Sequence, residues 1–576
     1  MADKLVLDTW TPMSFKRAMG NRKTGGQSWT TPTWVGDHDR RLQAYTVLAA
    51  YLDNAARHFL GPVGDREERE EHREYGDAAL IRNQALSALL GDDQRIVVEG
   101  ADDYNPDAED EEQDEEEAQD QEESRAALEL QEWLEAWAAD ERFPVKMQEC
   151  ERNAVGLGDG VYVLGWSSRK QRPRLRVFDP GFYFPVLDDS NEDEFPSRVH
   201  IAWELPPEEG KPGVRIRRMT WELAPIGTEP GPDGELELQD GEFYDENTGQ
   251  VTRQLPWNDE PTDLTCYFTD AVWTLQGNAS VEDLSESQAE YMTNEDGDEL
   301  DRLDIELDFI PVIHVSNTIS VSEHYGRSSL AYVLQILDDL ANSDTDLQAA
   351  SSTTGTPPIA LGGATMGTEK LSYRPGSILE IGDGRMDVLD TSNALDALLG
   401  YVEKLLDRIS VNGRLPAALL GRVDASEVPS GLALQLSFGP LSSMVREMRL
   451  ARNDKYSLVF KFAHRMALAA GLDVPARWFP AHLQFGSYLP ADVQSTVGSV
   501  TQLLNAKAIS LETAVRMLQD AGLPIEDAVA EVSRIESRDF EGADRLLDAT
   551  GDPDAVDLYL GRETVSSAPE PPTENE

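Results

Sequence analysis

A strand-rich stretch from about residue 154 to residue 320, with helical segments on both sides, constrains the fold most. Its β-branched and aromatic runs, such as "GVYVLGW" and "SRVHIAWEL", are separated by Gly, Pro and Asp, as short strands are. Residues 37–60 repeat apolar side chains every three or four positions, and residues 76–90 read as a second helix. Strands gathered in one stretch and helices in others predict an α+β fold.

The size and charge of the chain limit what it can do. A chain of 576 residues is too long for a single core, so we expect several domains. Its 50 Lys and Arg residues face 107 Asp and Glu residues, which gives a net charge of −57. Such a charge argues against a surface that binds nucleic acid or anionic lipid broadly. Any contact with DNA is therefore expected to be local.

Cysteine content and hydropathy point to an unanchored protein of a reducing compartment. Cys150 and Cys266 are the only cysteines, and they lack the spacing of a disulfide framework or a zinc site. The start, "MADKLVLDTWTP", lacks a signal-peptide pattern, and no run approaches the roughly 18 apolar residues of a membrane span. We expect a cytoplasmic location until assembly and no contact with a membrane.

An acidic run interrupts the N-terminal helical region. Of the 22 residues from Asp102 to Glu123, 14 are acidic. Charge repulsion and the shortage of apolar side chains predict a disordered insertion at about 101–125. A DNA-mimicking or protein-docking segment is the alternative. A short helix, "LELQEWLEAW", is expected to follow it.

Three glycines, Gly156, Gly158 and Gly160, resemble a phosphate-binding loop only superficially. The stretch "GLGDGVYVLGW" leads into a strand instead of joining a strand to a helix, and no GKS or GKT follows. We interpret it as a tight turn.

Two helices enclose a small β segment after the strand-rich region. Residues 328–352 carry Leu330, Val333, Leu337 and Leu340 on one face, and acidic residues lie outside that face. The segment "PPIALGG" and a β-hairpin closing at Asp383-Gly384 come next, and residues 394–411 return as a helix.

The following connection, "RLPAALLGRVDASEVPSGLAL" at residues 414–434, is longer and more apolar than an ordinary link between helices. Residues 441–470 then form one long helix with Arg446, Arg449, Arg452 and Lys455 at helical spacing. Three short helices are expected between about 491 and 540, the middle one opened by Ser510 and Glu512. The last residues have a disordered composition.

The sequence offers no motif for catalysis. It has no GxxxxGK[ST] loop and no GxSxG elbow, and its eight histidines never fall at HxH or HExxH spacing. Acid pairs such as Asp338-Asp339 are common in so acidic a chain. We therefore expect no enzymatic activity, no metal and no cofactor.

The order of the parts resembles the portal proteins of tailed double-stranded DNA bacteriophages. The resemblance covers roughly residues 40–540 and rests on "AVGLGDGVYVLGW", "HYGRSSLAYVLQILDDLANSDTDLQAAS" and "SGLALQLSFGPLSSMVREMR", taken with their order. Portals form a ring, generally of twelve subunits, at one capsid vertex. The resemblance implies a DNA channel for packaging and ejection. It also implies contacts with the terminase large subunit, the major capsid protein and a head-to-tail adaptor.

The resemblance also implies a division into parts: an N-terminal arm, a β-rich wing, two stem helices, a β-containing clip, a tunnel loop, a long wing helix, a helical crown and a tail. The arm would be 1–36 and the wing 37–327. The stem helices would be 328–353 and 394–411, with the clip at 354–393 between them. The tunnel loop would be 412–429, the part with the long wing helix 430–490, the crown 491–545 and the tail 546–576. The implied locations are the virion and, during assembly, the host cytoplasm.

Three groups of site residues follow from this division. The tunnel loop would present Ala417, Ala418, Leu419, Leu420 and Arg422 to passing DNA, or pack on the neighbouring subunit. The stem acids Asp338, Asp339, Asp344 and Asp346 would line the channel and repel phosphates, so that DNA slides without binding. Arg446, Arg449 and Arg452 would face DNA or, as we prefer, acids of the adjacent subunit.

Two other classes of protein remain open. An acidic scaffold or adaptor would bind a basic partner by charge without forming a ring. A nuclease would use its acid clusters to bind Mg²⁺.

Overall fold

The structure is a computed structural model with two compact units. It describes residues 39–56, 74–104, 115–187, 196–206, 214–227, 241–245, 250–275, 288–294, 299–318, 324–355, 359–362, 385–388, 392–421, 437–488 and 493–520, with a few short pieces besides. The first unit comprises residues 1–90 and 94–485, and the second comprises 91–93 and 486–576. Both helices and several sheets are present, which confirms the α+β class.

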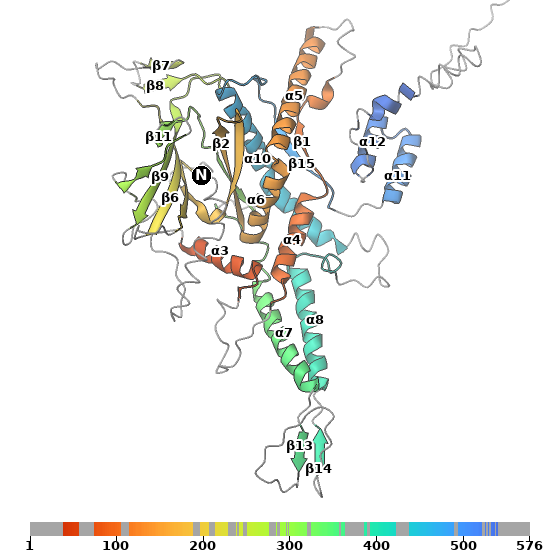
Figure 1. Ribbon diagram of the computed structural model, residues 1–576. Helices are drawn as coiled ribbons and strands as arrows, with labels where there is room; N and C mark the ends of the chain where they lie inside the picture. Colours follow the sequence, from red (N-terminus) through yellow and green to blue (C-terminus); the bar gives the residue numbers. More distant parts are fainter. Residues whose placement is uncertain are drawn as a thin grey trace, which may run out of the picture. The chain divides into compact units, whose positions relative to one another are not determined.

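A three-stranded antiparallel sheet stands at the centre of the first unit. Strand β2 (Asp159–Ser167) lies between β12 (Val312–Ser316) and β3 (Arg172–Phe178). The first six residues of β2 are all buried, because helices α6 (Phe143–Leu157) and α10 (Gly439–Ala469) pack beside this sheet. Figure 1 shows these helices and strands next to one another.

A second, larger sheet holds most of the remaining strands. Its order is β10-β9-β6-β5-β4, and β11 pairs with β9. The strands are β4 (Tyr183–Val186), β5 (Arg198–Glu204), β6 (Val214–Pro225), β9 (Leu264–Leu275), β10 (Glu290–Tyr291) and β11 (Asp301–Asp304). A separate pair joins β7 (Glu242–Asp245) to β8 (Gln250–Arg253). The predicted strand-rich stretch is thus confirmed.

Helices α3 (Asp39–Leu52), α4 (Asp77–Leu90) and α5 (Glu115–Asp140) precede the sheets. Helix α5 corrects the expectation of a disordered insertion at 101–125, because its helical residues begin within the acidic run. Apolar side chains that recur along α5 anchor it, and five of them are buried: Ala127, Leu130, Leu134, Trp137 and Ala138. Residues 105–114 of the run lie outside the described residues.

The glycine-rich stretch is a helix-to-strand turn, as predicted. Gly158 ends α6 with φ +112, and its N–H donates to the Ala154 carbonyl at 2.8 Å. A Cβ at Gly158 would lie 2.7 Å from the Gly326 carbonyl oxygen. Only glycine fits this backbone position without strain.

We expect Gly158→Ala to lower the free energy of unfolding by about 2 to 3 kcal/mol, because alanine adds both backbone strain and a clash. Gly165→Ala in the same sheet is the matched control, since no atom lies within 4 Å of its Cβ position. Its effect should stay within about 0.5 kcal/mol in urea unfolding. Equal losses in the two variants would contradict the role given to Gly158.

Strand β1 (Gln94–Val98) pairs antiparallel with β15 (Ala481–Phe485), although nearly four hundred residues separate them. The second unit contains α11 (Val493–Asn505) and α12 (Leu511–Asp520). The Ser510 hydroxyl accepts a hydrogen bond from the Thr513 N–H at 3.2 Å, which confirms the predicted helix start. Of the third predicted helix, residues 531–535 are described as helical.

Among the described residues, no helix is both long enough and apolar enough to cross a membrane.

Candidate functional site

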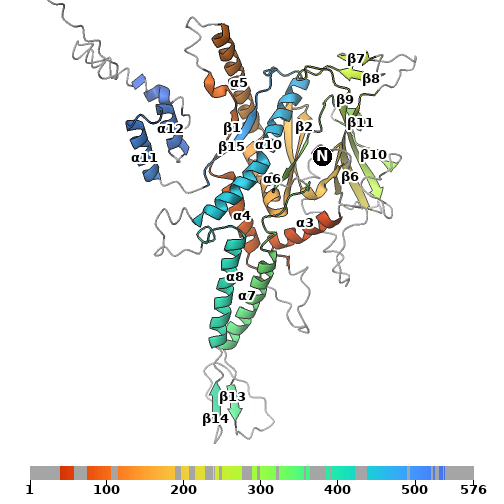
Figure 2. The same ribbon diagram turned by 180° about the vertical axis from the view of Figure 1, so that it is seen from behind.

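Helices α7 (Leu334–Gly355) and α8 (Ser392–Asn412) form an antiparallel pair. The two helices lie side by side in both Figure 1 and Figure 2. Leu337 and Leu340 of α7 are buried, as are Leu405 and Ile409 of α8. Burying apolar side chains of this size contributes about 1.5 to 3 kcal/mol each, so this seam holds the pair together.

A short strand pair stands at the far end of the two helices. Strands β13 (Ile359–Gly362) and β14 (Arg385–Val388) are antiparallel, with Ile359 opposite Val388. Strand β14 pairs with β13. The predicted hairpin across Asp383-Gly384 falls in residues 363–384, which lie outside the described residues.

Polar contacts fasten the start of α7 to the central sheet. The Ser328 hydroxyl donates to the Gly156 carbonyl at 2.7 Å, and the Ser329 N–H donates to the Val155 carbonyl at 3.0 Å. Residues 329–333 form turns, so the helix begins later than the predicted residue 328. The root of α7 is therefore fixed on the α6–β2 turn.

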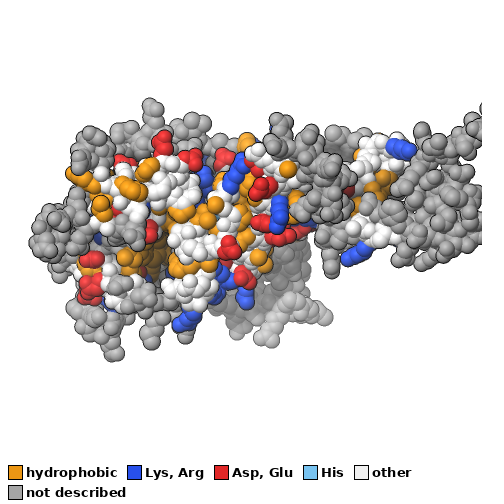
Figure 3. All heavy atoms as spheres, turned by 90° about the horizontal axis from the view of Figure 1, so that it is seen from above, with side chains coloured by type: hydrophobic (Ala, Val, Ile, Leu, Met, Phe, Trp, Pro, Cys, Tyr) orange, Lys and Arg blue, Asp and Glu red, His pale blue; other side chains and the backbone are white. Residues whose placement is uncertain are grey.

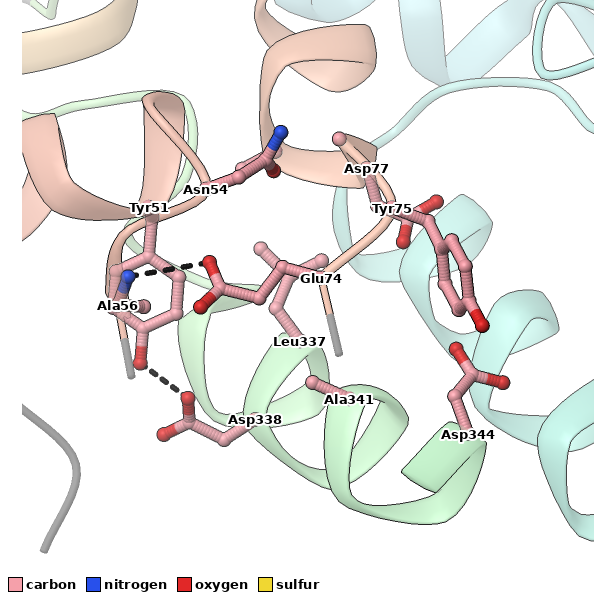
Figure 4. A pocket seen from close by; sticks show the side chains of 12 residues that line it. Tyr51, Asn54, Ala56, Glu74, Tyr75, Asp77, Leu337, Asp338, Ala341 and Asp344 are labelled. Atoms are coloured by element: carbon pink, nitrogen blue, oxygen red, sulfur yellow. Dashed lines mark hydrogen bonds between the residues drawn. The ribbon is translucent and has the colours of Figure 1, made fainter. Parts of the chain in front are cut away.

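A small pocket lies where α7 meets the ends of α3 and α4 (Figure 4). The Tyr51 hydroxyl donates a short hydrogen bond to Asp338, and the Ala56 N–H donates to Glu74 at 3.2 Å. Asp77 and Asp344 complete a group of four carboxylates around this pocket. Burial and then the charge of Asp77 raise the pKa of Asp344, and burial raises the pKa of Asp77.

These raised pKa values predict how stability changes with pH. Asp344 in the folded chain keeps its proton to a higher pH than in the unfolded chain. Its contribution to stability is therefore present at acidic pH and is lost as pH rises through the folded-state pKa.

We expect Asp344→Asn to raise the stability at neutral pH and to flatten this slope. Unfolding in urea from pH 4 to pH 7 measures both. The control is Asp454→Asn, at an exposed acid of α10, which should leave the slope unchanged. Identical curves for Asp344→Asn and the wild type would contradict the prediction.

The four predicted stem acids do not share one environment. Asp338 binds Tyr51 and Asp344 lines the small pocket, so neither forms a simple exposed channel lining. The reason is that both are on the side of α7 that meets α3 and α4. Asp339 is exposed and Asp346 is partly exposed.

The segment after α8 begins as a compact turn. The Leu415 side chain is buried, and the Leu415 carbonyl accepts from the Ser410 hydroxyl at 2.5 Å. The N–H groups of Leu419, Leu420 and Gly421 each donate to the carbonyl three residues earlier. The side chains from Ala417 to Leu420 are partly exposed. Arg422 and the residues to 436 lie outside the described residues.

The predicted row of arginines on α10 is corrected in two of its three members. Arg446 is exposed, as a residue at a subunit interface would be in one copy. Arg449 instead donates from Nε to the Leu89 carbonyl at 3.0 Å, and its guanidinium lies 5.0 Å from the centre of the Phe485 ring. Arg452 is fully buried. Steps of three residues turn a helix by about 300°, so this row winds from the surface into the core.

Arg452 belongs to a buried network within the first unit. Its Nε donates to Glu151 at 2.6 Å, and both side chains are 0% exposed. The Tyr456 hydroxyl also donates to Glu151, at 2.6 Å. A further Arg452 nitrogen donates to the Asn317 side-chain oxygen at 3.0 Å. This network joins α10 to α6 and to the segment that follows β12.

A second buried cluster surrounds Asp159 at the start of β2. Its carboxylate accepts a short hydrogen bond from Tyr45, a contact from His314 Nε2 at 2.7 Å and the Gly326 N–H at 2.8 Å. His324 stacks on His314 with ring centres 4.6 Å apart. Burial and the neighbouring His314 lower the pKa of His324 to about 3, so this imidazole is neutral at physiological pH.

This cluster forms one side of a hollow of about 910 Å³ that is otherwise mostly apolar. Sequence reasoning missed it, since Asp159, His314 and His324 are distant in the chain or lie at uninformative spacing. One signal was present: Asp159 is a lone acid at the start of an apolar strand. Among the described residues, no group of three or more His, Cys, Asp or Glu side chains could hold a metal ion.

No known family model matches the sequence. No curated protein matches it significantly either.

Proposed function

We propose that copies of this chain close into a ring that conducts double-stranded DNA, as the portal protein at one vertex of a tailed-phage capsid. One observation carries the proposal. The antiparallel pair α7–α8 has a strand pair at its far end, and it returns through the turn at 417–421 toward the long helix α10. In the proposed ring, the segment that follows the helix pair would face the duplex.

The charge of the chain supports sliding in preference to binding. Helix α7 contains no Lys or Arg, so it offers no cation to a phosphate. Partly exposed Ala417, Ala418, Leu419 and Leu420 offer no cation to a phosphate. On the face seen in Figure 3, the described acidic and basic side chains are interspersed with hydrophobic ones. DNA would pass such a wall without the salt-dependent grip of a basic groove.

The proposed partners follow from the same assignment. The region around β13 and β14 would meet the terminase large subunit during packaging and a head-to-tail adaptor afterwards. The β-rich part would meet the major capsid protein. The ring, with about twelve copies, would reside in the virion after assembly in the host cytoplasm.

Negative-stain imaging and mass measurement of the purified chain test the proposal. Rings with a central hole are expected, and monomers at every concentration would refute it. A second measurement places the turn. Ala418→Cys should react with a small maleimide in the ring but resist a bulky one, whereas Val145→Cys, 63% exposed on α6, should react with both. Cys150 and Cys266 are buried and should stay silent. Reaction of Ala418→Cys with the bulky reagent in intact rings would place the turn outside the channel.

One observation favours a second function. The acidic run continues into α5, where Asp120 and Glu122 are exposed, so it offers negative charge to a basic partner. An acidic adaptor would bind that partner as a monomer. Incubation with linear DNA and Mg²⁺ tests the remaining class, since cleavage lost on replacing particular carboxylates would indicate a nuclease.

A further inference from the structure

Exposed charges of opposite sign lie on the outer face of α7 and on one flank of α8. On α7, the face opposite Leu337 and Leu340 carries Gln335, Asp339 and Asn342, which are all exposed. On α8, Lys404, Arg408 and Val411, which are also exposed, lie together on one flank of the helix, beside the seam of Leu405 and Ile409 and not opposite it. The outer face of α7 thus presents an acid between two amides, and one flank of α8 presents two cations.

The acids of α8 are set apart from these cations. Asp396, Glu403 and Asp407 recur at spacings of seven and four, so they form their own row along the helix. Lys404 and Arg408 are one turn apart, and successive side chains are about 100° apart around a helix. They therefore lie on the flank of α8 between the buried seam and the acidic row. Small residues, Ala397 and Gly400, continue the basic side along the helix and allow close approach.

The two faces also match in height along the pair. A Cβ at Gly413 would lie 3.8 Å from Val333 Cγ1, which places these residues together at one end. Ile359 stands opposite Val388 at the other end. The helices therefore run in step, and Asp339 lies within about one residue, roughly 1.5 Å along the axis, of the level of Arg408. Lys404 lies about one turn further along.

A closed ring has no axial offset between neighbouring subunits, so if the helix pair runs along the ring axis, residues at equal height meet across each contact. Exposed apolar side chains stand at the same end of both helices: Tyr332 is 67% exposed just before α7, and Val411 is 75% exposed on α8. Apolar side chains beside a charge pair are typical of an interface between subunits.

We propose that the basic side of α8 in one copy packs against the acidic face of α7 in the next copy, with Arg408 bonded to Asp339. This contact rests on the proposed ring and identifies the residues that set its register. It assigns Asp339 to the boundary between copies and not to the channel wall. The contact is heterologous, because a different face of each copy takes part, and such contacts generate rings when they close.

Charge reversal in the full-length chain tests this contact. Asp339→Arg and Arg408→Asp should each reduce the ring fraction by about tenfold, because like charges would face each other at every boundary. The double variant should restore rings. Asp396→Arg, a charge reversal in the other row of α8, is the matched control and should leave ring formation unchanged. Circular dichroism should show the same helix content in all variants.

Cross-linking gives an independent readout. The double variant Asp339→Cys/Arg408→Cys, treated with a bis-maleimide that spans the reach of an Asp–Arg pair, should give covalent ladders of subunits, and each single variant should not. Cys150 and Cys266 are buried, so they provide little background. If the wild type forms rings, both charge-reversal variants form them equally well and the cysteine variant gives no ladder, this contact is overturned but the ring is not. Wild-type protein that forms no rings would instead overturn the proposed function.

Discussion

Arg452→Met is expected to lower the free energy of unfolding by about 3 to 5 kcal/mol. The substitution would leave the Glu151 carboxylate buried without its cation, and the Asn317 side-chain oxygen would lose a donor. An uncompensated charge in the core has no water to solvate it, and so the folded state bears the full cost. Urea unfolding followed by circular dichroism measures the loss.

Two further variants make this prediction specific. Arg446→Met makes the same change at an exposed position six residues earlier on α10 and should shift stability by about 0.5 kcal/mol at most. The double variant Glu151→Gln/Arg452→Met removes both charges and keeps an acceptor for Tyr456. It should recover much of the loss. If Arg446→Met proved as damaging as Arg452→Met, the buried network could not be the cause.

Asp159→Ala is expected to cost about 3 to 5 kcal/mol, because it removes the acceptor of three groups at once. The Tyr45 hydroxyl, the His314 imidazole and the Gly326 N–H would be left facing an apolar side chain. Each buried polar group without a partner costs about 1 to 3 kcal/mol. The loss is measured by thermal or urea unfolding.

Asp159→Asn separates hydrogen bonding from charge. It keeps an oxygen for the Gly326 N–H, so its loss should fall between the wild type and Asp159→Ala. Asp454→Ala, at an exposed acid of α10, should change stability by about 0.5 kcal/mol at most. A loss from Asp159→Ala no larger than this control would show that the three donors find other partners.

The sequence predicted the elements well where burial follows a local period. The apolar spacing of residues 328–352 and 394–411 predicted the two paired helices, and the β-branched runs predicted the sheets. The same reasoning failed for the start of α5, where acid content suggested disorder. Ala127, Leu130 and Leu134 bury one face of that helix, and this packing outweighs the repulsion among exposed acids.

The site residues were harder to predict because their partners are distant in sequence. Arg446 and Arg452 share a three-residue spacing, but six residues turn a helix by about 600°, so their side chains point about 120° apart. Glu151, which binds Arg452, lies 301 residues earlier. Asp338 likewise meets Tyr51 across 287 residues. Tertiary pairing of this kind leaves no periodic signal in a single sequence.

The segment from Leu334 to Asn412 is a branch of the first unit that begins and ends at neighbouring points, since a Cβ at Gly413 would lie 3.8 Å from Val333 Cγ1. Helices α7 and α8 therefore form one branch that is attached to the rest of the unit at one end. An insertion in one helix alone would shift every contact between the two helices. Matched insertions in both helices would only move the β13–β14 strand pair further from the attached end. Evolution or protein engineering could therefore change the length of this branch, or replace it with a short turn, without changing the packing of the sheets and helices to which it is attached.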